Sequence, residues 1–305
     1  MLSKKFSGIS RNVLVLHATV FVWGFTGILG ALISVSAIPL VWYRVLIAFV
    51  ALYCYFKATK TSIRINTEAF LKLFFTGGLV ALHWILFFHS IKISTVSVTL
   101  VCLSSLTLFT AFLEPLIYRQ KIAMLEVITG LLIIAGIGLI FKFESRYTAG
   151  IITGLISSFC ASLFSIINSK QVKNRPAPII AFYELAGASV WVSLYLLVTG
   201  GYNSSLILPI KDIFYLLVLG VICTSLAYVA GVSVMKELTA FRVALITNLE
   251  PVYGIILAFI FLGKKEQMTG GFYGGACLIL GVIFLYPYVK NKIEKRKLNK
   301  LIPIG

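Results

Sequence analysis

The sequence contains few charged residues for a chain of its length. Only 12% of its 305 residues are Asp, Glu, Lys or Arg, whereas soluble domains carry about 25% because they need a hydrated shell. Hydrophobic residues make up 59% of the chain, and the mean hydropathy is +1.00. This composition excludes a water-soluble enzyme, a disordered tail and a secreted disulfide scaffold. It predicts a protein whose main solvent is lipid.

Residues and motifs typical of enzymes are also scarce. The chain has a single aspartate, Asp212, which excludes a paired-aspartate protease, and it lacks the HExxH, GxSxG and P-loop motifs. The five cysteines lie in apolar runs without a CxxC pair, and His83 and His89 are six residues apart, which puts them on different helix faces. No selectivity-filter loop or ring of charges indicates a channel. We therefore expect no enzyme activity, catalytic residue, metal site or cofactor. A non-transporting membrane scaffold, or with less support a membrane-embedded enzyme, is the alternative.

The chain contains apolar runs that are long enough to cross a bilayer. A helix needs roughly 20 apolar residues to span the hydrocarbon core, and the loops between the runs are short. The fold class expected is an all-α integral membrane protein with ten transmembrane helices. The predicted spans are 12–34, 38–56, 69–91, 95–117, 123–141, 149–171, 177–199, 213–235, 240–262 and 272–289.

Basic residues predict the orientation of these spans. Of the 27 Lys and Arg residues, 20 fall in segments on the same side as the N-terminus, six fall on the other side, and Arg44 lies within a helix. Because Lys and Arg accumulate on the cytoplasmic side, both termini are expected in the cytoplasm, with the chain in a cell membrane, the bacterial inner membrane being favoured. The net charge of +17 is then a topology signal and does not indicate nucleic acid. The basic C-terminal end suits anionic lipid headgroups.

Two pairs of similar segments indicate an internal duplication. The segment 129–136 resembles 274–281, and 39–44 resembles 179–184. Five spans per half would turn the second half upside down, which is the inverted-repeat plan of secondary transporters. We predict a first five-helix repeat over 1–145, a second, inverted repeat over 146–290 and a basic cytoplasmic tail over 291–305.

Local motifs add a family resemblance. The first span contains Val-Trp-Gly-Phe-Thr-Gly at 22–27, the second contains Trp-Tyr-Arg-Val-Leu-Ile-Ala at 42–48, and each half ends in a glycine-spaced helix after a basic turn. In this order, the motifs resemble the EamA family of the drug/metabolite transporter (DMT) superfamily. The resemblance implies a permease that exports or exchanges a small metabolite such as an amino acid. It also implies a central cavity between the halves, and the inverted plan with buried charges favours alternating access.

The ninth span contains an ionisable residue beside a proline. A charge at the bilayer centre costs about 2.5 to 3.5 kcal/mol on insertion scales, so it requires a reason. Glu250 precedes Pro251, which crowds the carbonyl group of Thr247 and breaks the helix pattern. Thr247, Glu250 and Tyr253 recur every three residues, which suits a cation, an amine or a proton. The alternative is a packing kink in which Glu250 pairs with a neighbouring helix.

Arg44 and Glu184 occupy equivalent positions in the two halves with opposite charges. Arg44 could attract a substrate carboxylate, or it could serve the structure by snorkelling or by pairing with a helix end. Glu184 is a candidate for gating or proton binding.

Two polar stripes occur on otherwise apolar helices. Ser97, Ser104, Thr107 and Glu114 share one face of the fourth span, and four serines share a face of the sixth span beside Asn168. Such faces either line a wet cavity or let helices pack closely. Aromatic rings could also face a substrate. The complete set of expected pathway residues is Trp23, Arg44, Trp84, Thr107, Glu114, Asn168, Glu184, Tyr228, Thr247, Glu250 and Tyr253, with Pro251 as the helix break.

The expected partners are a small-molecule substrate and membrane lipid, and no nucleic acid. Proton coupling, exchange and facilitated diffusion all remain open for this sequence, as does a homodimer.

Overall fold

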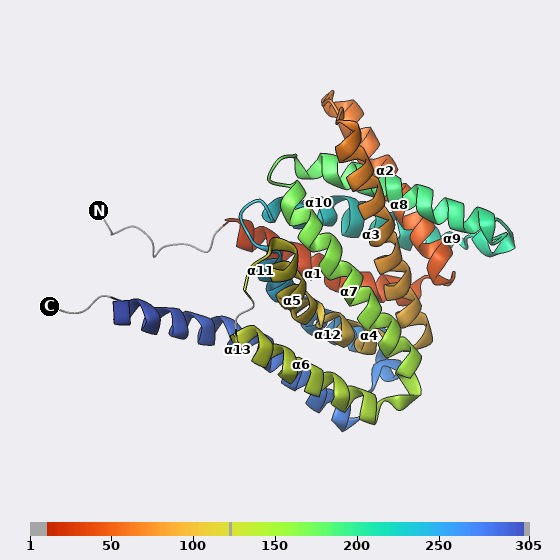
Figure 1. Cartoon of the computed structure of the whole chain (residues 1–305). Helices are drawn as coiled ribbons and strands as arrows, with labels where there is room; N and C mark the ends of the chain where they lie inside the picture. Colours follow the sequence, from red (N-terminus) through yellow and green to blue (C-terminus); the bar gives the residue numbers. More distant parts are fainter. Residues whose placement is uncertain (1–10, 122–123, 302–305) are drawn as a thin grey trace.

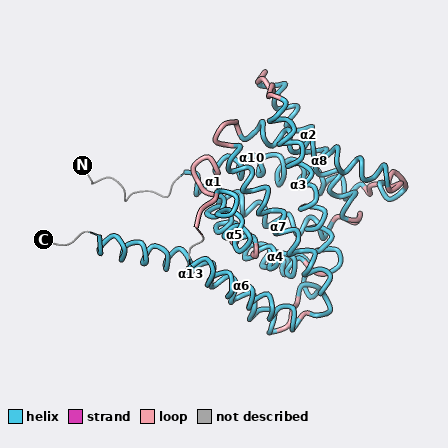
Figure 2. The backbone as a smooth tube through the Cα atoms, in the orientation of Figure 1, coloured by secondary structure: helices cyan, strands magenta, loops and turns pink. Residues whose placement is uncertain are grey.

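The computed structural model describes residues 11–121 and 124–301, and its regular elements within these ranges are all helical (Figures 1 and 2). Ten helical segments are long and apolar enough to cross a membrane. The predicted fold class, an all-α membrane protein with ten spans, is therefore confirmed. The N-terminal Lys4 and Lys5, used to predict orientation, and the end of the expected tail, 302–305, lie outside the described residues.

Some spans are single helices and others are interrupted. The uninterrupted helices are α1 (Arg11–Leu32), α2 (Ala37–Thr59), α3 (Thr67–Ile93), α6 (Met124–Phe143), α7 (Thr148–Gln171), α8 (Ala177–Val198) and α13 (Gly270–Leu301). The fourth span is divided into α4 (Val96–Leu103) and α5 (Leu106–Tyr118), and the ninth into α11 (Ala240–Thr247) and α12 (Leu249–Leu262). The eighth span runs through α9 (Ile210–Leu217), a π-helical stretch (Val218–Leu226) and α10 (Ala227–Val234). The short 3₁₀ turns are η1 (Ser145–Tyr147), η2 (Ser204–Leu206) and η4 (Gly263–Glu266).

The bundle has two faces, which we name by the course of the chain. The terminal face is the one at which α1 begins, and the opposite face is the one at which α1 ends. The end of α13 lies on the same side of the bundle as the start of α1 (Figure 1). Helix α13 does not stop at the expected end of the tenth span, 289, but continues as a helix to Leu301, so much of the predicted tail is helical.

Helices α3 and α8 approach each other at two glycines. A Cβ atom added to Gly77 would collide with the main chain at Glu184, and one added to Gly187 would collide with the main chain of Phe74. Small residues allow this close contact, which membrane helices use in place of a hydrophobic driving force. The contact holds Glu184 in the centre of the bundle, where it is fully buried.

We predict that Gly77→Ala lowers the thermal stability of the protein in detergent. Because the obstructing atoms are main chain, the helices must separate, and overpacking of this kind costs about 1 to 3 kcal/mol. The matched control is Gly138→Ala on α6, where no atom lies within 4 Å of the added Cβ. Melting curves of both variants test this, and equal melting temperatures would contradict the close contact.

Candidate functional site

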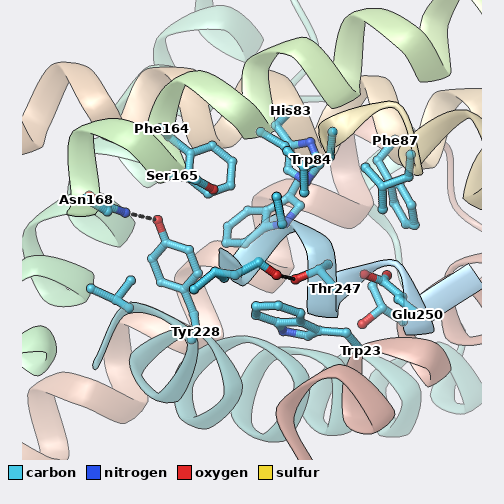
Figure 3. Close-up of a pocket in the computed structure, with 18 of the residues that line it drawn as sticks. Trp23, His83, Trp84, Phe87, Phe164, Ser165, Asn168, Tyr228, Thr247 and Glu250 are labelled. Atoms are coloured by element: carbon cyan, nitrogen blue, oxygen red, sulfur yellow. Dashed lines mark hydrogen bonds between the residues drawn. The ribbon is translucent and has the colours of Figure 1, made fainter. Parts of the chain in front are cut away.

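A cavity of about 90 Å³ lies where the interrupted spans meet α1, α2, α3 and α7 (Figure 3). Its lining includes Met235, just after α10, and Val243, in the first turn of α11, and also Thr26, Arg44 and Phe87 in the halves of α1, α2 and α3 nearer the opposite face. The cavity therefore extends from the terminal side past the centre of the bundle. Seven of the predicted pathway residues line it, namely Trp23, Arg44, Trp84, Asn168, Tyr228, Thr247 and Glu250.

Arg44 brings a buried positive charge to this cavity. Its side chain is 2% exposed, Nε donates a hydrogen bond of 2.6 Å to Thr224 Oγ1, and the guanidinium lies 4.1 Å from the ring centroid of Trp84. Nη1 has no hydrogen-bond partner among the described residues, and no described ion pair involves Arg44. Thr26 Oγ1, also in the lining, is likewise buried without a partner. Two unpaired polar groups facing a cavity suit an anionic ligand group, because buried polar atoms otherwise carry a cost.

Glu250 brings a carboxylate to the same cavity. It is 5% exposed and stands in the first turn of α12, directly after the break at Asn248. Thr247 donates its hydroxyl to the Val243 carbonyl, 2.9 Å away, as a helix residue often does. Pro251 does not lie at the break itself but three residues beyond it, within the first turn of α12, where a missing N–H leaves no gap in the helix.

The two divided spans meet at their breaks. Asn248 donates from Nδ2 to Thr107 Oγ1, just after the break between α4 and α5, and also to the Ala244 carbonyl. Helix α4 packs against α12, and α5 packs against α11. Interrupted helices in corresponding positions of two halves are the recurrent setting for binding sites in secondary transporters.

Each short half-helix begins in the same way. Both α4 and α11 have eight residues, and each starts after a threonine, Thr95 or Thr239, whose hydroxyl oxygen accepts a main-chain hydrogen bond from three residues on. Each also receives a glutamate from the far end of the other divided span. Glu266 accepts from the main chain of Val96 and Ser97 at the opposite face.

The corresponding contact at the terminal face is weaker. Glu114 Oε2 accepts from the Phe241 N–H at 2.8 Å, at the start of α11. Glu266 has three bonds, including one of 2.7 Å from the Ser97 hydroxyl, and is 5% exposed. Carboxylates suit helix N-termini because the free N–H groups there carry partial positive charge.

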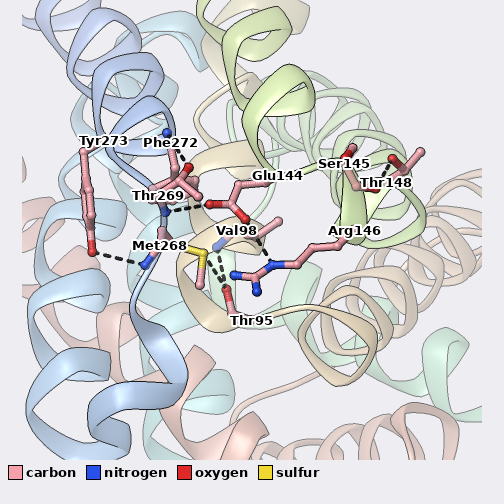
Figure 4. Close-up of polar contacts among 10 residues, drawn as sticks. All are labelled: Thr95, Val98, Glu144, Ser145, Arg146, Thr148, Met268, Thr269, Phe272 and Tyr273. Atoms are coloured by element: carbon pink, nitrogen blue, oxygen red, sulfur yellow. Dashed lines mark hydrogen bonds and ion pairs between the residues drawn. The ribbon is translucent and has the colours of Figure 1, made fainter.

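Further contacts close the opposite face. Asp212 Oδ2 accepts from the N–H and the hydroxyl of Ser34, at 2.8 and 2.6 Å, which ties the end of α1 to the start of α9. Glu144 accepts from the Thr269 N–H at 2.8 Å and pairs with Arg146 at 3.3 Å (Figure 4). These bonds lie on the side away from the cavity.

Four predicted pathway residues lie outside the cavity lining. Thr107 and Glu114 hold the divided spans together, as described above, and Tyr253 packs against Gly24 and Phe21 on α1. Glu184 lies behind the lining and bonds to Asn168 and Tyr228. The serine stripe of the sixth span divides in the same way, since Ser162 bonds to Thr110 whereas Ser165 lines the cavity.

Sequence reasoning missed several residues of this region. Thr26, His83, Phe87 and Phe164 line the cavity, and Thr224 positions Arg44. His83 bonds through Nδ1 to the carbonyl of Ser157 at 2.9 Å, so the histidine is held by the neighbouring helix. The hydrogen-bond partner of a threonine in an apolar helix cannot be predicted from the local sequence, because that partner lies on another span.

We predict that Arg44→Met raises the melting temperature in detergent. The change removes one hydrogen bond and a stacking contact. It also removes a buried charge that has no ion-pair partner among the described residues, and burying such a charge costs several kcal/mol. Thr224 keeps a partner, because its hydroxyl donates to the Leu219 carbonyl.

The control for this variant is Arg44→Lys, which retains a buried charge without the planar guanidinium. It should not gain stability. A lower melting temperature for Arg44→Met than for the unmodified protein would show that Arg44 serves the structure.

Comparison with known proteins places the chain among transporters. The family described as EamA-like transporter matches residues 11–142 and again residues 148–286. The chain is 22% identical to the uncharacterized transporter YdfC of Bacillus subtilis, over 89% of this chain and 88% of the relative. It is also 22% identical to an uncharacterized transporter of Clostridium kluyveri, over 69% of this chain and 67% of the relative.

A solved crystal structure shares the fold. It matches 92% of this chain and 99% of its own, with a TM-score of 0.69 and 14% identical residues. The two matched repeats, the ten apolar helices and the transporter relatives point to a multi-pass membrane transporter that contacts lipid and a small-molecule substrate, and not to an enzyme. The chain belongs to the EamA-like transporter family, within the DMT superfamily.

Proposed function

We propose that the protein is a secondary transporter that exports or exchanges a small metabolite, such as an amino acid, across the cytoplasmic membrane. The observation that carries this proposal is the cavity that Arg44 and Glu250 share with Trp23 and Trp84. It offers a cation, a carboxylate and ring faces within one small space. A metabolite with both charges and an apolar part complements all three.

The asymmetry of the two faces supports alternating access. The cavity reaches the terminal side through Met235 and Val243, while Glu266, Asp212 and Glu144 join elements at the opposite face. We infer that this is the state open to the terminal side, and that transport requires the bonds of Glu266 to break while those at Glu114 tighten.

The orientation follows from the charges and the repeats. We infer that the terminal face is cytoplasmic, with the membrane that of a bacterial cell, and that the repeats over 1–145 and 146–290 are inverted. The five candidate spans in each matched repeat support the inversion, since an odd number reverses the direction of the second copy. The basic residues at the end of α13 suit anionic lipid and require no nucleic acid.

A membrane scaffold is the rival function. It would leave the unpaired Arg44 Nη1 and Thr26 Oγ1 without a purpose, whereas a transporter uses them for its substrate. Nothing in the described residues favours a homodimer over a monomer. Uptake of a metabolite mixture into proteoliposomes, followed by analysis of what is retained, separates carrier from scaffold, because a scaffold retains nothing selectively.

We predict that Glu250→Gln reduces transport of the substrate found in this way by about tenfold or more, which corresponds to about 1.4 kcal/mol or more of lost interaction. The amide has the shape of the carboxylate but no charge to meet a substrate cation. Initial rates in proteoliposomes measure the loss. The matched control is Glu237→Gln, which alters an exposed carboxylate after α10 and should transport normally. Equal rates for both variants would remove Glu250 from the site.

The topology has its own test. We predict that a cysteine in place of Lys264, exposed in the turn after α12, reacts in intact cells with a thiol reagent that does not cross membranes. The variant is made in a chain without native cysteines. A cysteine at Glu237 is the control and should react only after the membrane is opened. The reverse pattern would invert the orientation.

A further inference from the structure

A fully buried group of polar side chains lies directly behind the cavity wall. Glu184 Oε2 accepts hydrogen bonds from the Tyr228 hydroxyl at 2.7 Å and from Asn168 Nδ2 at 3.1 Å. Asn168 Nδ2 also lies 3.1 Å from the Tyr228 oxygen, which closes the triangle. Asn168 and Tyr228 line the cavity, where Figure 3 shows the contact between them, and Glu184 does not.

This group of three side chains has fewer hydrogen-bond donors than its acceptor oxygens require. Glu184 Oε1 and Asn168 Oδ1 are both buried without a hydrogen-bond partner among the described residues. Both residues are fully buried, so water does not satisfy these oxygens at the surface. Burying an oxygen without a hydrogen bond costs about 1 to 3 kcal/mol, and each of these two oxygens lacks a hydrogen-bond donor. A proton on Oε1 supplies one donor, whereas a metal ion such as calcium would require about six or more oxygen ligands.

No other charge satisfies Glu184. The elements packed against α8 are α2, α3 and α10, and α7 reaches Glu184 through Asn168. Of their charged or titratable groups, only Tyr228 contacts Glu184 in the part of the chain that the structure describes. His83 is held by Ser157, and Arg44 by Thr224 and Trp84. The remaining charged or imidazole groups of these elements are Lys57, Glu68, Lys72, His89, Lys92 and, on α7, Lys170.

We propose that Glu184, Asn168 and Tyr228 form a proton-binding site that couples proton movement to the substrate cavity. This rests on the proposed transport function and adds its driving ion. The proton forms an O–H bond at Glu184 Oε1 and is released to water in the cavity when Glu184 ionises. The only bond that changes is this O–H bond, so the charge carried by the site changes by one.

Protonation of Glu184 affects the cavity through Asn168 and Tyr228, which line it. When Oε2 belongs to a neutral carboxylic acid, it accepts more weakly, so Tyr228 and Asn168 are freer to turn toward the cavity. Tyr228 is also packed edge-on against Trp84, with centroids 5.7 Å apart, and Trp84 carries Arg44 on its ring. Protonation of Glu184 thus alters the wall that holds the substrate, and binding of substrate alters proton release by the same factor.

The test is infrared difference spectroscopy of the full-length protein in lipid vesicles, recorded while the pH is changed. A carboxyl that takes up a proton gains a carbonyl band that shifts in heavy water. Glu184→Gln should lose the band of one carboxyl, and Tyr228→Phe should keep this band with a shifted titration midpoint. Glu68→Gln, which alters an exposed carboxylate paired with Lys72, should match the unmodified protein.

Each outcome decides the proposal. If Glu184→Gln retains every band, the proposal is overturned. An unchanged titration midpoint in Tyr228→Phe would overturn it as well, and this second variant keeps the test available if Glu184→Gln does not fold. A spectrum that responds to sodium at constant pH, and not to pH, would assign the site to a metal ion instead.

A second readout distinguishes failure of this site from failure of the transport proposal. In proteoliposomes, a pH gradient should accelerate substrate movement through the unmodified protein, and Glu184→Gln should lose this acceleration. The infrared spectra require no substrate. If no variant transports, the proposed function is contradicted, while the carboxyl bands still test the proton site. Exchange that responds equally to the gradient in both proteins would overturn the site alone.

Discussion

The absence of water inside a bilayer is the constraint on which the rest of this structure depends. A helix that stops inside hydrocarbon exposes N–H and C=O groups that no solvent can satisfy. This chain stops two helices there, at Leu103 and Thr247, and it satisfies the polar groups internally. Asn248 bonds across to Thr107 and back to the Ala244 carbonyl, so one amide side chain serves both breaks. The breaks can therefore exist only because the two divided spans cross, and the cavity forms at that crossing.

The same constraint explains which charges the bundle tolerates. Asp212, Glu144 and Glu266 are all buried, yet each accepts at least one main-chain N–H bond, so each has a structural role. Glu144 Oε2 accepts no hydrogen bond but pairs with Arg146, whereas Arg44 Nη1 and Glu184 Oε1 have neither a hydrogen-bond nor an ion-pair partner among the described residues. A fold selected for stability alone would not bury such atoms, since apolar residues of the same size cost less. In the proposals made above, a substrate group and a proton supply these missing partners.

The sequence sufficed for the spans because hydropathy is a property of each segment by itself. Ten apolar runs predicted ten spans, and all ten occur. The roles of Glu114 and Glu266 depend instead on contact between spans far apart in the chain. Glu114 was expected to line a cavity, because a polar stripe looks the same on a wet face and at a helix contact. Glu266 was overlooked because it lies in a short turn among lysines, where a carboxylate looks like a solvated charge.

The tail shows another limit of this reasoning. The sequence predicts that the last span ends near 289, where lysines begin, because lipid no longer favours the helix there. The structure continues the helix to Leu301, since lysine and glutamate are good helix formers in water as well. Hydropathy predicts the residue at which a helix leaves the membrane, and the helix itself can continue beyond that residue.

The two glutamate contacts also bear on the proposed alternating access. Glu266 follows α12 and holds the start of α4, whereas Glu114 lies in α5 and holds the start of α11. Each contact thus joins the far end of one divided span to the beginning of the other, and the two contacts lie on opposite faces. The proposed alternating access requires α4 and α12 to part while α5 and α11 stay joined, and the breaks after Leu103 and Thr247 are the points at which each divided span can bend. Continuous helices would transmit the movement along their length and open both faces together. The breaks therefore lie beside the cavity and supply the bending points that the proposed alternating access requires.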